Sequence, residues 1–235
     1  MKRSQVTIFM ILALVMLIAF ILFFILRQPS EIDLRFDQDS IESYLKSCLR
    51  QTASSSLELL GKQGGTIQLQ EHVAAPHYGI SYAVRDSENT LYSTQHMESQ
   101  LSGDVKNHLN DCLKDFTEFK KGGWEVDAGT LGIRTSINLE DASFIADYPL
   151  TVRQGEGTIS ISSFTISLPV RLSGMHEAMN TVAEFWLQHD KTDLTYLNSI
   201  GFNTTVFPYK DALVVRLMDN HLLNNRPFAF QAALS

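Results

Sequence analysis

An apolar run at the start of the chain constrains its fold more than any other feature. Val6 to Leu26 holds 21 residues without a charged side chain, and it follows the Lys2-Arg3 pair closely. A helix of this length spans roughly 31 Å, which matches the hydrocarbon core of a bilayer, about 30 Å thick. The run therefore predicts a transmembrane helix over residues 6–26, after a basic cytoplasmic tail of residues 1–5.

The residues that flank this run predict its orientation. Two basic residues precede it, whereas Arg27 alone follows it directly. An excess of Lys and Arg marks the cytoplasmic side, and the run is too long for the apolar core of a cleaved secretory signal. We therefore expect a single-pass protein of the cell membrane, with the lipid bilayer as partner of residues 6–26 and the C-terminal domain outside the cytoplasm.

The first ten residues, MKRSQVTIFM, carry a resemblance to a known class of signals. A basic pair, a small residue and a glutamine that opens a long apolar helix resemble the class III, prepilin-type signal of archaeal surface proteins. The resemblance implies a signal-peptidase junction between Ser4 and Gln5. The opening is also similar to the KRGQVT-type starts of uncharacterised membrane-anchored proteins of small-genome archaea, and this second resemblance implies no activity.

Charge is distributed unevenly along the chain. All 26 Asp and Glu follow residue 30, against 16 Lys and Arg there, so the outer part is acidic by about ten charges. A protein that binds nucleic acid needs a basic stripe to replace the counterions of the phosphates. We therefore expect no nucleic-acid partner, and a soluble exterior explains the acidic balance.

Residues 27–39 predict a short stalk, because Pro29 interrupts a helix. One extracytoplasmic α+β domain is expected over residues 40–235, with 40–123 and 124–235 as candidate sub-units. Helices are predicted at about 40–62 and 96–120, each closed by a glycine pair, with short strands at 66–70 and 78–84. Apolar residues of the first helix recur every three or four positions: Ile41, Leu45, Leu49, Ala53, Leu57 and Leu60.

The pattern changes to period two after Trp124. Three alternating runs, at 131–139, 144–152 and 164–172, predict an antiparallel meander with one buried face. A helix at about 174–189 and strands at 203–207, 212–218 and 227–232 complete the prediction. The fold class expected is therefore α+β: an N-terminal transmembrane helix, then an antiparallel sheet covered by about three helices.

Cys48 and Cys112 are the two cysteines of the chain, and they occupy matching places in the first two predicted helices. An even count outside the cytoplasm favours a disulfide between them. Two buried free thiols are the alternative. A metal site is not expected there, because neither cysteine has a second Cys or a His at ligand spacing.

Other chemistry is sparse in this sequence. His72, His77 and Glu71 come closest to a ligand cluster, but no His-x-x-x-His or Gly-x-Ser-x-Gly motif occurs. We therefore assign no catalytic, metal or cofactor-binding residue and expect no enzyme and no cofactor. Asn203-Thr204-Thr205 is an N-glycosylation acceptor sequence, so Asn203 is a candidate modification site.

Three functions fit these observations. The first is a membrane-tethered extracytoplasmic module for interaction or envelope structure, with an unknown protein or surface as partner. The second is a pilin-like subunit of a surface filament, which Phe9, where pilins have Glu, and the interruption at Pro29 place below the first. The third is an anchored hydrolase or solute-binding receptor.

Overall fold

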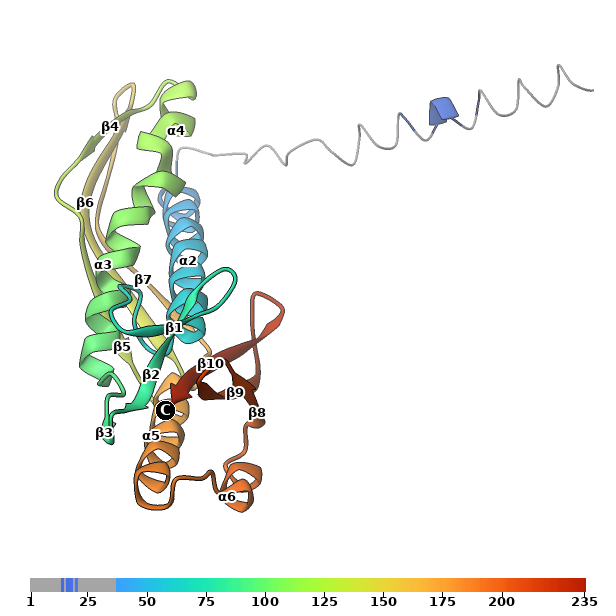
Figure 1. Ribbon diagram of the computed structural model, residues 1–235. Helices are drawn as coiled ribbons and strands as arrows, with labels where there is room; N and C mark the ends of the chain where they lie inside the picture. Colours follow the sequence, from blue (N-terminus) through green and yellow to red (C-terminus); the bar gives the residue numbers. More distant parts are fainter. Residues whose placement is uncertain (1–13, 15, 19, 21–36) are drawn as a thin grey trace, which may run out of the picture. The chain divides into compact units, whose positions relative to one another are not determined.

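Two long helices lie side by side in the described part of the chain (Figure 1). The computed structural model describes residues 14, 16–18, 20 and 37–235, and Arg35–Ser235 form one compact unit. The predicted junction at Ser4 and Gln5, and most of the apolar run 6–26, lie outside the described residues. No helix within the described part is long and apolar enough to cross a membrane.

The first long helix, α2 (Gln38–Lys62), begins at Asp37, whose carboxylate accepts a hydrogen bond from the Ser40 amide. An N-cap of this kind satisfies a free amide of the first turn. The predicted apolar face is buried along the whole helix. Its neighbour α3 (Thr94–Leu113) is capped by Ser93 in the same way.

A four-stranded sheet packs against these helices, and β6 (Ala142–Gln154) runs through its centre. β7 (Gly157–Leu168) pairs with one edge of β6, while β4 (Glu125–Ala128) and β5 (Gly132–Ile137) share the other edge. The β6–β7 register shifts between Asp147 and Leu150. Pro149 falls within this shift, which agrees with the confinement of proline to edges and bulges.

A second, six-stranded sheet has the order β1-β2-β10-β9-β8, with β3 paired to β2. β2 and β10 are parallel, and the other pairs are antiparallel. α5 (Leu172–His189) packs against β2 and β10, and the short α6 (Leu194–Ser199) precedes β8. The strands are β1 (His72–Ala74), β2 (Gly79–Arg85), β3 (Glu88–Asn89), β8 (Asn203–Tyr209), β9 (Ala212–Leu223) and β10 (Arg226–Leu234).

The predicted fold class is therefore wrong. The sequence predicted a transmembrane helix followed by one antiparallel sheet under about three helices, but residues 37–235 form a mixed α/β fold with two sheets and five α-helices, and none of the described helices is suited to span a membrane. Apolar alternation predicts where strands run but not which edges pair. The pairing of β2 with β10 joins opposite ends of the domain, which no local pattern predicts.

The segment 66–70, predicted as a strand, is a loop. Side chains bind its backbone groups, which are therefore unavailable for a strand ladder. Gln63 Nε2 donates to the carbonyls of Thr66 and Ile67, and Gln100 Oε1 accepts from the amides of Ile67 and Gln68.

The C-terminal end of α2 approaches β10 closely at Gly61. A Cβ atom at Gly61 would lie 2.3 Å from the carbonyl oxygen of Ala229, so a larger residue requires the backbone to move. Gly64 follows with a φ of +80°, a conformation that favours glycine. The buried Gln231 donates from Nε2 to the carbonyl of Lys62 and so satisfies a helix-end acceptor.

The second predicted helix, at 96–120, is interrupted. Lys114, Asp115 and Phe116 all have positive φ angles, between +47° and +58°, before α4 (Thr117–Lys121) resumes the helical course. This turn places the Phe116 ring 5.9 Å from that of Phe119 and 6.0 Å from that of Tyr148. Burial of an aromatic cluster therefore offsets the cost of left-handed backbone, about 1–2 kcal/mol per residue.

Replacement of Lys114 by glycine should stabilise the protein by about 1 kcal/mol, because its left-handed conformation suits glycine. The matched control is Lys106→Gly, on an exposed position inside α3, which should destabilise by about 1 kcal/mol. Urea unfolding of the two variants measures both changes. Equal losses of stability would show that the turn carries no strain.

Candidate functional site

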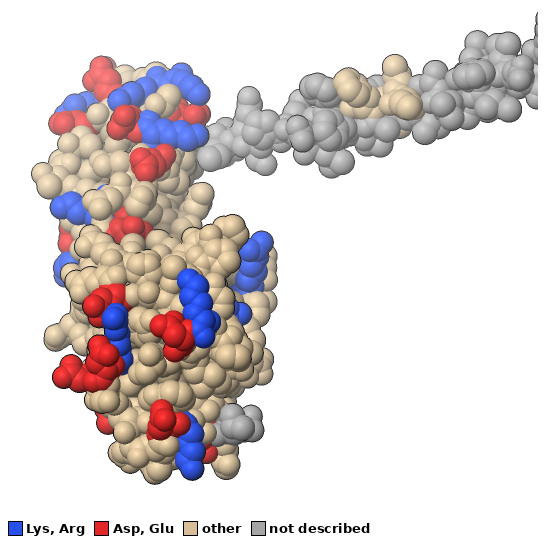
Figure 2. All heavy atoms as spheres, viewed as in Figure 1, with Lys and Arg blue, Asp and Glu red and all other residues tan. Residues whose placement is uncertain are grey.

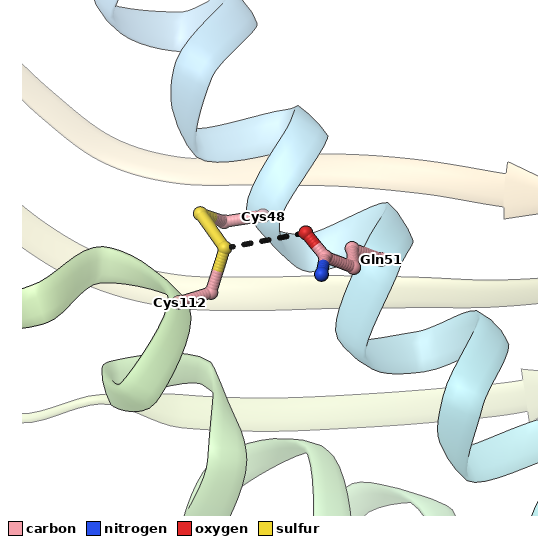
Figure 3. The surroundings of a disulfide bond; sticks show 3 residues. All are labelled: Cys48, Gln51 and Cys112. Atoms are coloured by element: carbon pink, nitrogen blue, oxygen red, sulfur yellow. Dashed lines mark hydrogen bonds between the residues drawn. A yellow bond between two sulfur atoms is a disulfide. The ribbon is translucent and has the colours of Figure 1, made fainter. Parts of the chain in front are cut away.

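A disulfide joins the two long helices. Cys48 of α2 and Cys112 of α3 are bonded, with Cα atoms 5.6 Å apart. Cys48 is buried, and Cys112 is half-buried near the end of α3. Gln51 Oε1 lies 3.8 Å from Cys112 Sγ (Figure 3), as a polar contact, because a disulfide sulfur has no proton to donate.

The bond links residues 64 positions apart in sequence. By the chain-entropy account, closing such a loop stabilises the folded state by about 4 kcal/mol. That is a large fraction of the 5–15 kcal/mol typical of a folded domain. Reduction of this bond should therefore remove a large part of the stability of the folded unit.

A buried carboxylate lies at the centre of a polar cluster. Asp219 lies on β9 and is 1% exposed. Arg171, which immediately precedes α5, donates from Nη2 to Asp219 Oδ1 at 2.6 Å and from Nε to Asp219 Oδ2 at 3.1 Å. His221 adds its backbone amide and its Nδ1, at 3.2 and 3.1 Å from Asp219 Oδ1.

The electrostatics of this cluster follow from the same contacts. Burial alone raises the pKa of Asp219, but the hydrogen bonds from Arg171 and His221 outweigh it and hold that pKa well below its ordinary value. The carboxylate raises the pKa of Arg171 in return. The Arg171 guanidinium also lies 4.6 Å from the centroid of the Phe202 ring. Arg171 therefore links the start of α5 both to Asp219 on β9 and to Phe202, which directly precedes β8.

The Asp219–His221 pair has the arrangement of an acid–base dyad, with an imidazole that is 53% exposed. Its carboxylate is already neutralised by the two-point contact with Arg171, which limits its ability to stabilise an imidazolium. Within the described part, no nucleophilic side chain hydrogen-bonds to the other ring nitrogen of His221. The cluster anchors the start of α5 to β9, and sequence analysis missed it because its partners are 48 residues apart.

One face of the six-stranded sheet is rich in aromatic side chains. It is the face that carries the side chains of Val214 and Ala233. The buried residues beneath it are Val73, Ile80, Ala212, Val214 and Ala233. Five partly buried residues pack against this cluster, and we call them the aromatic face: Ala75, Tyr78, Tyr82, Phe207 and Tyr209. Arg85, Arg216 and Lys210 each lie within 6 Å of a ring centroid of Tyr82, Phe207 and Tyr209, respectively.

Contacts of this kind combine large apolar area with cations and hydrogen-bond donors. On the side drawn in Figure 2, acidic and basic side chains intermix, most densely beside α4, and wide areas of uncharged surface lie below.

The predicted site residues fall in separate places. Asn203 is exposed at the start of the edge strand β8, where its Nδ2 donates to Asn220 Oδ1 at 3.1 Å. His72 bonds the carbonyl of Gln70, and Glu71 pairs with Arg85 instead of joining a ligand cluster. In the portion that the structure describes, no group of three His, Cys, Asp or Glu is placed to hold a metal.

Two other histidines face the interior. His176 Nε2 lies 2.9 Å from the carbonyl oxygen of Tyr92, and this contact requires the proton on Nε2. His96 stacks on the Tyr92 ring, with centroids 4.3 Å apart. Burial lowers the pKa of both imidazoles, so both favour the neutral form.

Comparisons with protein-family models, with curated proteins and with solved structures give no match for this chain.

Replacement of Asp219 by asparagine should destabilise the protein by about 3 kcal/mol near neutral pH, because it leaves the Arg171 guanidinium unpaired. The folded-state pKa of Asp219 lies below its unfolded value, so its contribution is full above about pH 5 and is lost as the pH falls further. The stability gap between wild type and Asp219→Asn should therefore narrow below about pH 4. Urea unfolding over a pH series measures this gap.

The matched control is Asp211→Asn, which alters an exposed carboxylate and should change stability little at any pH. A gap for Asp219→Asn that stays constant down to pH 3 would contradict the assignment of the ion pair.

Proposed function

We propose that residues 35–235 form an extracytoplasmic interaction module of the cell envelope, held at the membrane by the apolar run 6–26. The observation that carries this proposal is the Cys48–Cys112 disulfide. Structural disulfides persist in oxidising compartments and are rare where thioredoxin and glutathione keep thiols reduced. The orientation expected from Lys2 and Arg3 agrees with this location.

The interaction role is supported by the aromatic face. Half-exposed tyrosine and phenylalanine rings supply contact area at low conformational cost, and they are enriched where proteins bind partners. Arg85, Arg216 and Lys210 border these rings and add donors without forming a single-sign field, because Glu71 pairs with Arg85. A neutral or mixed-charge partner fits this surface better than a polyanion does.

A non-catalytic role is part of the proposal. The best acid–base pair in the described residues, Asp219–His221, is occupied by Arg171. Other polar contacts of the described residues cap helices or bind loop backbone, as those of Asp37 and Gln100 do.

Cysteine labelling in intact cells tests the location. A membrane-impermeant maleimide should label Ser235→Cys, at the exposed C-terminus, before the cells are lysed. The control Gln5→Cys, on the other side of the apolar run, should react only after lysis. Protection of Ser235→Cys until lysis would place the domain inside the cytoplasm and remove the proposal.

A further inference from the structure

The outer edge of β7 has no partner strand among the described residues. In the described part of the chain β7 pairs with β6 alone. Twelve residues long, it carries no charged residue and no proline. Unpaired edges of this length offer free amides and carbonyls to another strand, and proteins ordinarily block them.

The other sheet edges of this domain carry such blocks. β1 and β3 are only three and two residues long. β4 has exposed Glu125 and Asp127, β5 has exposed Arg134, and β8 contains Pro208. Short length, charge and proline all prevent edge-to-edge pairing. The sequence of β7 has none of these features, so it does not itself block pairing with another strand.

The direction of the backbone supports this interpretation. Arg50 of α2 donates from Nη1 to the carbonyl oxygen of Ser167 at 3.4 Å. That carbonyl therefore faces away from β6. The β6–β7 register is regular from Leu168 to Ser163, so the amides and carbonyls of Thr165 and Ser163 face the same free edge.

The sequence of β7 is self-complementary. All six of its Ser and Thr residues are exposed, and its Ile, Phe and Leu side chains are buried or half-buried. The alternation changes phase at the adjacent Ser162 and Ser163, so the order of polar and apolar residues is the same from either end. Within residues 158–167, like residues match when counted inward from both ends: Thr158 with Ser167, Ile159 with Ile166, Ser160 with Thr165, Ile161 with Phe164, and Ser162 with Ser163.

From these observations we propose that β7 pairs antiparallel with β7 of a second copy of this chain, about a two-fold axis between Ser162 and Ser163. The two four-stranded sheets then form one continuous sheet, with hydroxyls opposite hydroxyls on the exposed face and apolar side chains opposite each other on the helix-covered face. Cross-strand Ser/Thr and aliphatic pairs of this kind stabilise sheets. The interface is isologous, as closed two-fold dimers require. This proposal goes beyond the proposed function and does not depend on the compartment.

Proline at Thr165 tests the pairing. Thr165→Pro removes an amide that faces the free edge, and proline is tolerated at such edge positions. Thr165→Val is the matched control, because it keeps both the amide and a β-branched side chain. Light scattering of the full chain in detergent should give the wild type and Thr165→Val twice the protein mass of Thr165→Pro. Equal masses for the two variants, or a monomeric wild type, would overturn the proposal.

Cross-linking provides a second test that does not depend on how Thr165→Pro folds. Two differently tagged full-length chains carry Ser160→Cys and Thr165→Cys, which the proposed register places directly opposite each other. Oxidation of the mixture should join the two different chains and leave each variant alone largely uncross-linked. Cross-linking that is absent, or equal in all combinations, would contradict the register.

Discussion

The position of α2 is the constraint on which the rest of the domain depends. This helix contacts α3, β7 and β10, so it is shared by both sheets. It is held at two points: by the bond from Cys48 to Cys112, and by the approach of Gly61 to the backbone of Ala229. The disulfide restrains α2 covalently at Cys48. At Gly61 the helix lies so close to the carbonyl oxygen of Ala229 that there is no room for a Cβ atom.

The remaining anchors have different physical origins. Arg171 and Asp219 fix the start of α5 to β9 by a buried ion pair, which stabilises only while both partners are present. Phe116 enters the aromatic cluster beside α4 through a left-handed turn. Covalent, electrostatic and aromatic contacts thus hold three separate regions of the domain.

Local pattern was sufficient to place much of this structure. Helix periodicity from Ile41 to Leu60 and alternation from Phe144 to Val152 correspond to α2 and β6, because one buried face sets the spacing of apolar residues. Pairing between distant segments was not predictable. The parallel contact of β2 with β10 and the salt bridge of Arg171 with Asp219 depend on where the chain returns, which periodicity does not encode.

Some of the candidate sites were predictable from local sequence pattern, and others depend on contacts between distant segments. Cys48 and Cys112 could be paired from their count and matching helix positions, whereas the aromatic face required the sheet order to bring Tyr82 beside Ala233. The edge of β7 lies between these cases. Its residue order is visible in the sequence, but only the assembled sheet shows that no other described strand pairs with this edge.

The central claim is that this domain folds and works in an oxidised, extracytoplasmic state. The most direct test is the thiol state of protein isolated from its own cells, trapped with an alkylating agent before any reductant is added. The account predicts that neither Cys48 nor Cys112 is alkylated in mass spectrometry, and that both react after reduction. Two alkylated thiols without reduction would contradict it.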